Sequence, residues 1–255
     1  MELFERISGA RMHTALYRPF GFGGDFMWGS FVRDLLFILT RGSRIISGAF
    51  LGLLNNRAMR SRCSGVGSFS KKKITSYGIS GVIARASGVS TDARLGLGSV
   101  TYSAYGSFSL STFLGLRGDC YDRFVVRARE MLESFLIITQ ALPILNSILN
   151  KSIGADSYNK RSKFVSMESV ISHFKVSAGF GPLVKSIAIS SIEGPKGFVG
   201  VLIVNSGSVS PYRFHVRSPV AHNLHLLSTA SNGYTFADFV ATFCSLDVVL
   251  GEIDR

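Results

Sequence analysis

The spacing of apolar positions predicts a mainly helical chain. The clearest helix covers 121–142, where apolar residues recur in steps of three and four: Tyr121, Phe124, Ala128, Met131, Phe135, Ile138 and Leu142. Asp119 stands where it can cap this helix, and Pro143 is expected to end it. Further helices are predicted over 2–18, over 30–62 as one interrupted or two separate helices, and over about 166–177, 219–229 and 235–245.

Between residues 183 and 217 the apolar residues recur at every second position, which is the spacing of a β-strand. Ile187 and Ile189 alternate with small polar residues, and Phe214 and Val216 alternate with basic ones. Turn residues at 193–197 and 205–211 separate these runs, which predicts a small antiparallel sheet. Residues 74–118 are irregular, with short strands as one option around 99–105. The fold class is therefore α+β, mainly helical over 1–150 and mixed helix and sheet over 160–255.

The composition is unusually apolar for a free monomer. Of the 255 residues, 46% are hydrophobic and only 17% charged, so extensive contacts with partners are expected. The two longest apolar runs, Phe31–Leu54 and Leu132–Leu149, are interrupted by charged, amide or proline residues. We therefore predict that neither spans a membrane. The first residues also lack the apolar core of a targeting peptide.

The net charge of +12 attracts nucleic acid, an anionic membrane or an acidic protein alike. Basic residues cluster at Arg57, Arg60 and Arg62 and at Lys71–Lys73, but no nucleic-acid recognition motif accompanies them. Solvated or partner-paired faces are the favoured interpretation. The three cysteines lack CxxC spacing, which indicates a reducing compartment and no disulfide framework.

Two acids stand out as candidates for chemistry. Asp25 follows a glycine-rich loop bordered by aromatic residues, a setting that could raise its pKa toward a proton-transfer role; an ordinary turn aspartate is the equally weighted alternative. Asp247 lies within an apolar run and would need a partner, for which a structural salt bridge is the plain explanation.

Other polar groups favour structural roles. His222 and His225 could ligate a metal with Asp238 or Cys244, but hydrogen-bonded histidines are the more common case, and no metal site is predicted. The sequence contains neither a nucleophile elbow nor a complete dinucleotide-binding fingerprint. Four charged residues around the start of the 121–142 helix are expected to form a structural network: Arg117, Asp119, Asp122 and Arg123.

Several segments together carry a family resemblance. They are 5–13 (ERISGARMH), 117–123 (RGDCYDR), 166–169 (SMES), 191–197 (SIEGPKG), 211–213 (PYR) and 251–255 (GEIDR). In this order they resemble the 49-kDa quinone-module subunit of respiratory complex I, the NADH:ubiquinone oxidoreductase. The resemblance implies the fold of the nickel–iron hydrogenase large subunit without its metal ligands. It also implies a ubiquinone-reducing cavity beside the terminal iron–sulfur cluster, coupled to proton pumping.

The resemblance assigns roles residue by residue. Asp25 matches the catalytic acid beside the quinone headgroup. The cavity is expected to be lined by residues of the preceding loop, the residue after the acid and the C-terminal tail: Tyr17, Gly21, Phe22, Phe26, Asp247, Val249 and Arg255. Arg57, Arg60 and Arg62 would face the cluster-bearing partner. This chain alone would hold no cofactor; ubiquinone is the substrate, and NADH, FMN and iron–sulfur clusters belong to partner subunits.

The expected partners are the iron–sulfur small subunit, a 30-kDa-type subunit and the quinone-channel membrane subunit, on the matrix side of the mitochondrial inner membrane. Two departures from the family pattern matter. Asp25 is followed by Phe26-Met27 where the family has Leu-Pro, and the N-terminal half that carries the quinone-binding His and Tyr has no counterpart in this sequence. A separate chain is therefore expected to supply it. The alternative is a basic organellar RNA-binding or ribosome-associated protein.

Overall fold

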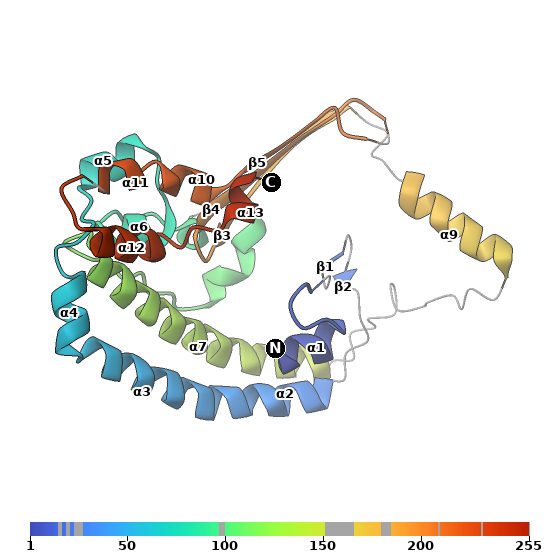
Figure 1. Ribbon diagram of the computed structural model, residues 1–255. Coiled ribbons are helices and arrows are strands. Elements are labelled where there is room, and N and C mark those ends of the chain that lie inside the picture. Colours follow the sequence, from blue (N-terminus) through green and yellow to red (C-terminus); the bar gives the residue numbers. More distant parts are fainter. Residues whose placement is uncertain are drawn as a thin grey trace. The chain divides into compact units, whose positions relative to one another are not determined.

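The computed structural model describes residues 1–14, 17–18, 21–22, 28–96, 100–150, 166–179, 185–208, 210–230 and 232–254 (Figure 1). The chain forms two compact units that interleave in sequence. Unit 1 comprises 1–46 and 138–181, and unit 2 comprises 47–137 and 182–255. The predicted fold class is confirmed, because helices dominate and a three-stranded antiparallel sheet lies toward the C-terminus. The predicted division of the chain near residue 150 stays a prediction.

Unit 1 holds short elements near the N-terminus and three longer helical segments. They are α1 (Glu2–Ser8), β1 (Tyr17–Arg18), β2 (Gly21–Phe22), α2 (Trp28–Phe37), a π-helical turn η1 (Ile38–Gly42), the end of α7 (Cys120–Asn150) and α9 (Met167–Gly179). The prediction of one helix over 2–18 is wrong. Gly9 adopts φ 77° and its N–H bonds to the carbonyl of Glu5, which ends α1 at Ser8. Tyr17 and Phe22 instead pair across the β1–β2 hairpin.

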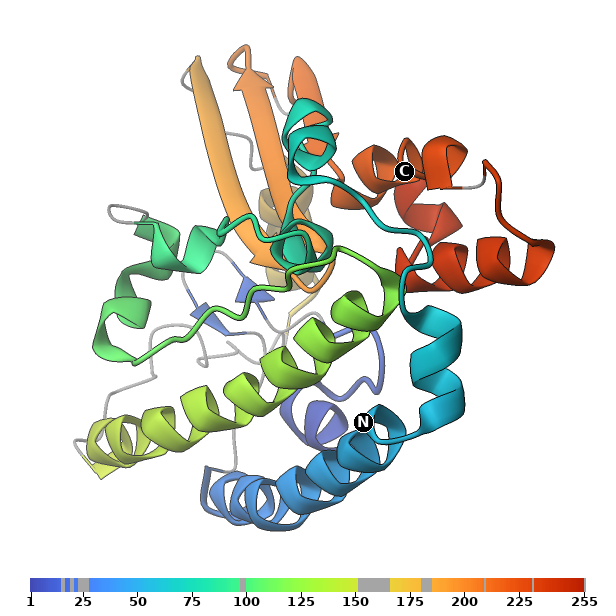
Figure 2. The same ribbon diagram turned by 90° about the vertical axis from the view of Figure 1, so that its left-hand side faces the viewer.

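Unit 2 contains the remaining helices and the sheet. Its elements are most of α3 (Ser43–Leu54), α4 (Arg57–Cys63), α5 (Lys71–Ser76), α6 (Gly81–Ala86), the 3₁₀ turns η2 (Ala93–Leu95) and η3 (Val100–Ser107), the start of α7, β3 (Ser186–Gly194), β4 (Gly197–Asn205), β5 (Arg213–Arg217), α10 (Pro219–Leu224), α11 (Leu227–Ala230), α12 (Phe236–Ser245) and α13 (Leu250–Asp254). Figure 2 shows β3, β4 and β5 side by side in that order.

The core of unit 2 forms where α5, α6, α11 and the end of α12 meet. Its apolar side chains are almost fully buried: Phe69, Ile74, Ile79, Ile83, Ala84, Val89, Leu226, Ala230 and Leu246. Gly81, at the start of α6, lies against the backbone of Gly197 at the hairpin turn, so α6 connects this core to the sheet. Burial of these residues away from water is the main stabilising term for unit 2.

The long amphipathic helix is confirmed, and its predicted end is wrong. The carboxylate of Asp119 accepts a hydrogen bond from the Asp122 N–H at 2.8 Å, which is the predicted cap of α7. The helix runs through Pro143 to Asn150. Pro143 is exposed, and a single proline removes only one backbone hydrogen bond, so the helix continues beyond it.

Two other expectations concern local structure. The strands considered around 99–105 are wrong, because Val100–Ser107 forms 3₁₀ turns whose Tyr102 and Tyr105 rings pack edge to face. The helix predicted at 166–177 is confirmed as α9, and the Ser166 hydroxyl accepts a hydrogen bond from the Ser169 N–H.

The exclusion of 31–54 as a membrane span was too strict. The helical stretch Phe31–Leu54 is long and apolar enough to cross a bilayer by length and composition. Its most apolar 18 residues have a mean hydropathy of 1.3, and none of them is buried. A helix that is covered by other protein segments can have the same length and apolar composition, so these properties alone assign no membrane role.

Candidate functional site

The residues predicted to line a cavity fall in two groups. Tyr17, Gly21 and Phe22 lie on the β1–β2 hairpin of unit 1, and Asp247 and Val249 lie near the end of unit 2. Asp25, Phe26 and Arg255 lie outside the described residues. The two groups belong to different units, and their meeting in one pocket stays a prediction.

The tail after α12 has a defined path. Leu246 is buried in the core, and Asp247 then adopts φ 54°, the left-handed region that non-glycine residues rarely occupy. The side chain of Asp247 is exposed, and its predicted place in the cavity wall stays a prediction. Burial lowers the pKa of Arg127 on α7, and the negative charge of Asp247 partly offsets that effect.

The last helix is held by Glu252. Its carboxylate accepts hydrogen bonds from the Lys196 ammonium at 3.3 Å and from the Ser218 hydroxyl at 3.0 Å. Lys196 comes from the β3–β4 turn and Ser218 immediately precedes α10, so a single side chain ties α13 to two other elements. Beside these bonds is an open cavity of about 340 Å³ that Val199 and Val216 help to line.

A buried arginine organises the start of α7. Arg123 is fully buried; its guanidinium donates to the Gly118 and Gly67 carbonyls at 2.8 and 2.9 Å and to the Ser245 hydroxyl at 3.0 Å. Desolvation lowers the pKa of Arg123, and the neighbouring Cys120 thiol and the Asp119 carboxylate act in the opposite direction. Asp119 is also fully buried and takes a second hydrogen bond from the Gly65 N–H at 2.9 Å.

Of the other two members of the predicted network, Arg117 is exposed and Asp122 is half-buried. Asp122 accepts hydrogen bonds from the backbone N–H groups of Leu116 and Arg117 at 3.1 and 2.7 Å, and the Arg117 guanidinium donates to the Ser64 hydroxyl at 3.2 Å. All four residues therefore fix the backbone around the helix start, mostly through bonds to main-chain groups. Their arrangement suits a structural role rather than substrate chemistry.

A second buried charge cluster was not predicted from the sequence. The guanidinium of Arg85 on α6, 2% exposed, lies 2.6 Å from Glu130, 2.9 Å from Glu193 and 3.7 Å from Asp92. Arg94 adds a 2.7 Å ion pair with Asp92. The cluster fastens β3 and η2 to α6 and α7. The one feature of the sequence that pointed to this cluster was Glu193, which lies within 191–197, a segment that carries the family resemblance.

The basic residues of α4 are exposed. Arg60 lies over the Tyr121 ring at 6.0 Å, and Arg62 is 3.9 Å from Asp238 on α12. Arg57, Arg60 and Arg62 thus lie on the surface of unit 2, and their predicted orientation toward a cluster-bearing partner stays a prediction.

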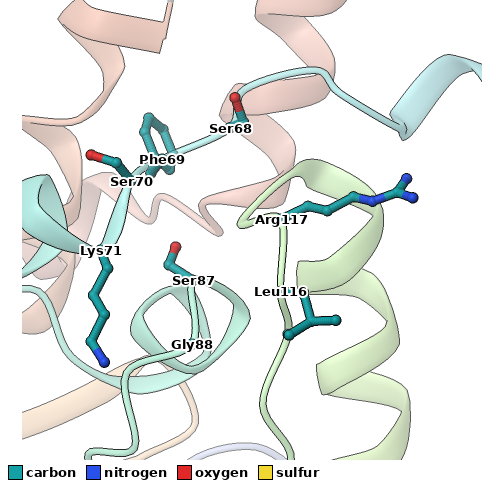
Figure 3. A pocket seen from close by; sticks show the side chains of 9 residues that line it. Ser68, Phe69, Ser70, Lys71, Ser87, Gly88, Leu116 and Arg117 are labelled. Atoms are coloured by element: carbon teal, nitrogen blue, oxygen red, sulfur yellow. The ribbon is translucent and has the colours of Figure 1, made fainter.

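Two cavities flank the segment before α7. One of about 500 Å³ is bordered by the 68–71 segment, the end of α6 and residues 115–117 (Figure 3). The other, of about 300 Å³, lies between α4, α7 and the same residues 115–117. Neither lining contains the group of convergent acids, bases or nucleophiles that a catalytic centre would need.

The histidines have structural partners. His222 is 3.0 Å from the Ser218 carbonyl through Nδ1, and the His225 ring stacks on Tyr77 with centroids 6.5 Å apart. Within the described ranges, no group of three or more His, Cys, Asp or Glu side chains is placed to hold a metal ion.

Comparison with known proteins gives the family. The family model described as "Respiratory-chain NADH dehydrogenase, 49 Kd subunit" matches residues 1–255. Over its full length the chain is 36% identical to the NADH-ubiquinone oxidoreductase 49 kDa subunit of Nyctotherus ovalis, 35% identical to that of Paramecium tetraurelia and 36% identical to that of Acanthamoeba castellanii. These alignments cover 62, 66 and 63% of the three relatives, so the chain spans slightly under two thirds of their length.

The chain therefore belongs to the 49-kDa subunit family of respiratory-chain NADH dehydrogenase. This confirms the resemblance inferred from the sequence segments. It gives no support to the RNA-binding or ribosome-associated alternative.

Proposed function

We propose that this chain is a core component of a mitochondrial-type NADH:ubiquinone oxidoreductase, in which it forms part of the cavity where ubiquinone is reduced. The observation that carries the proposal is the family match along all 255 residues. The three relatives named above are eukaryotic and carry the name of the same enzyme, which supports a mitochondrial setting. The chain would act as one part of the oxidoreductase and would not be catalytic alone.

The chemistry follows from the assigned residues. Reduction of ubiquinone to ubiquinol takes up two electrons and two protons. Electrons would arrive from an iron–sulfur cluster held by a neighbouring small subunit, since this chain is expected to hold no redox group. Asp25, beside the β1–β2 hairpin in sequence, would take part in the proton-linked step, while Tyr17, Phe22 and the tail around Val249 would shape the cavity wall.

The partners of the chain in the assembly are also proposed from its family membership. The partners would be the cluster-bearing small subunit, the 30-kDa-type subunit and the membrane subunit of the quinone channel, on the matrix side of the inner membrane. The exposed arginines of α4 support a protein-facing surface near the cluster-bearing partner. The apolar, uncovered stretch Phe31–Leu54 supports further protein contacts in the assembly.

Asp25→Asn tests the catalytic assignment. The amide keeps the shape and removes the titrating group, so ubiquinone reduction by the assembled enzyme should slow by about 10- to 1,000-fold. Assembly on native gels and NADH oxidation with an artificial acceptor should stay unchanged. Glu168→Gln, which removes a carboxylate at an exposed position of α9 outside the predicted cavity, serves as the control. Normal ubiquinone turnover in Asp25→Asn would remove the residue from the mechanism.

A further inference from the structure

The most exposed large hydrophobic side chain among the described residues is Leu116, which is 95% accessible. An exposed leucine on a loose loop needs no explanation. Leu116 instead belongs to a segment that is fixed on both sides. We propose that this segment, Gly115–Arg117, is a preformed ridge that docks an acidic segment of a partner protein.

The ridge is held by backbone hydrogen bonds. On one side the Gly115 N–H donates to the Arg85 carbonyl at 2.8 Å. On the other side the N–H groups of Leu116 and Arg117 donate to the Asp122 carboxylate. A Cβ at Gly115 would lie 2.3 Å from the Ala86 carbonyl oxygen, so glycine is required for this close approach. The leucine is thus presented in a defined position, which reduces the entropy lost on binding.

The ridge separates two hollows that can receive side chains. The cavity of about 500 Å³ lies on the α6 side and the cavity of about 300 Å³ on the α4 and α7 side. In Figure 3 the Leu116 and Arg117 side chains point away from the first cavity, and Lys71 lies on its opposite side. A chain crossing the ridge could place side chains in both hollows while covering Leu116.

The charge of the site selects the partner. Lys71 borders the first cavity, and Arg60, Arg117 and Arg129 border the second. None of these four cations forms an ion pair with a carboxylate of the described residues. The acid in the second lining, Asp122, already accepts two backbone hydrogen bonds. Aspartate or glutamate residues on either side of an apolar residue would complement this pattern.

The aromatic groups disfavour nucleic acid. Arg129 lies 5.5 Å over the Phe113 ring, and Arg60 lies 6.0 Å over the Tyr121 ring. Both rings therefore carry a guanidinium on a face where a base would stack. A single exposed leucine between the two cavities is also too small an apolar surface to anchor the chain on a bilayer.

The proposed docking site is separate from ubiquinone reduction and does not depend on it.

Zero-length carbodiimide cross-linking of the native assembly, followed by mass spectrometry, tests the proposal directly. Lys71 should join to an Asp or Glu of a different polypeptide, and the yield should fall at least fivefold in high salt. Hydroxyl-radical labelling should modify Leu116 at least tenfold more slowly in the assembly than in the urea-unfolded chain. Labelling of Leu116 at the unfolded rate would overturn the docking site.

Variants separate docking from folding. Arg129→Glu should lower the chain's recovery in the native assembly at least fivefold, whereas Arg129→Lys, which keeps the charge, should restore most of it. Leu116→Ala removes the anchor without adding charge, so it should lower the yield of the Lys71 cross-link at least fivefold and leave the chain's own protease pattern intact.

The remaining outcomes distinguish the partner and the function. Formaldehyde cross-linking of the same assembly covers the other partner classes, and cross-links from Lys71 to RNA or to an amine-bearing lipid in place of an acidic peptide would overturn the proposal. An acidic cross-link found in an assembly without NADH:ubiquinone activity would uphold docking and reject the proposed function.

Discussion

Arg123 shows how one side chain can fix three segments. It donates to Gly67, Gly118 and Ser245, and its guanidinium also lies 5.0 Å over the Phe69 ring. A lysine cannot reproduce this planar fork, so Arg123→Lys leaves buried carbonyls without donors. We expect a loss of about 3 kcal/mol or more in the free energy of unfolding, measured by urea denaturation. Exposed Arg129→Lys should cost under about 0.5 kcal/mol, and equal losses in the two variants would contradict this account.

Asp92 should make stability depend on pH. Its side chain is only 2% exposed, and burial alone would raise its pKa. Hydrogen bonds from the side chain and the backbone N–H of Arg94 have the opposite effect and are stronger together. The pKa of Asp92 is therefore lowered. A lowered pKa means that the stabilisation is complete above the unfolded value near 3.9 and is lost as the pH falls through the folded value. Asp92→Asn should therefore destabilise by about 1–3 kcal/mol at pH 7, with the difference shrinking below about pH 4. Denaturant titrations across pH 3–7 would measure it, and a constant difference would refute the role.

Contacts between residues close together in the sequence were predictable, and contacts between residues far apart in the sequence were not. The Asp119 cap follows from neighbours three residues away, so the sequence pattern was sufficient. The Arg85 cluster joins Arg85 to Glu130 and to Glu193, which are 45 and 108 residues further along the chain. Only the fold brings these charges together, and no spacing rule could have paired them.

Gly81 marks the joint between α6 and the sheet. It has φ +73°, and a Cβ there would lie 2.5 Å from the Cα of Gly197. Gly81→Ala thus combines backbone strain with a clash against backbone that cannot move cheaply. Gly233 has φ +83° with nothing within 4 Å of its Cβ position, so Gly233→Ala carries the strain alone.

We expect Gly233→Ala to cost about 1–2 kcal/mol and Gly81→Ala at least about 2 kcal/mol more. Thermal denaturation of the two variants beside the unmodified chain measures the difference. Equal melting temperatures for the variants would show that α6 and the hairpin turn separate without penalty.

Whole elements were predicted where periodicity was sustained. The α7, α9 and sheet segments each carry several turns or strands of regular spacing, and they were found in place. Errors fell where one residue decides the outcome: Gly9 ends α1 early, and exposed Pro143 fails to end α7. The glycine-rich stretch before α7 has no period, so its 3₁₀ turns were not foreseeable.

At the scale of the molecule, family segments were more informative than composition. The charge of +12 left nucleic acid, membrane and protein partners open, whereas the ordered segments identified the family that the comparison confirmed. The interleaving of the two units was not foreseeable, because it depends on contacts between 1–46 and 138–181 that no local pattern encodes. The residues predicted to line the cavity are divided between the two units, and their meeting in one site stays a prediction.

The membrane relationship of the chain depends on Phe31–Leu54. A bilayer-spanning placement would put Arg41 and Arg44 near the middle of the apolar core, at a cost of about 2.5–3.5 kcal/mol each. Asp34 is already paired with Arg6 of α1, which ties the start of the stretch to a polar helix. We therefore expect alkaline carbonate to release the chain from membranes together with the cluster-bearing small subunit. Retention in the membrane pellet, together with labelling of Ile45 and Leu51 by a photoreactive lipid, would instead place this helix in the bilayer and make the chain an integral rather than a peripheral component.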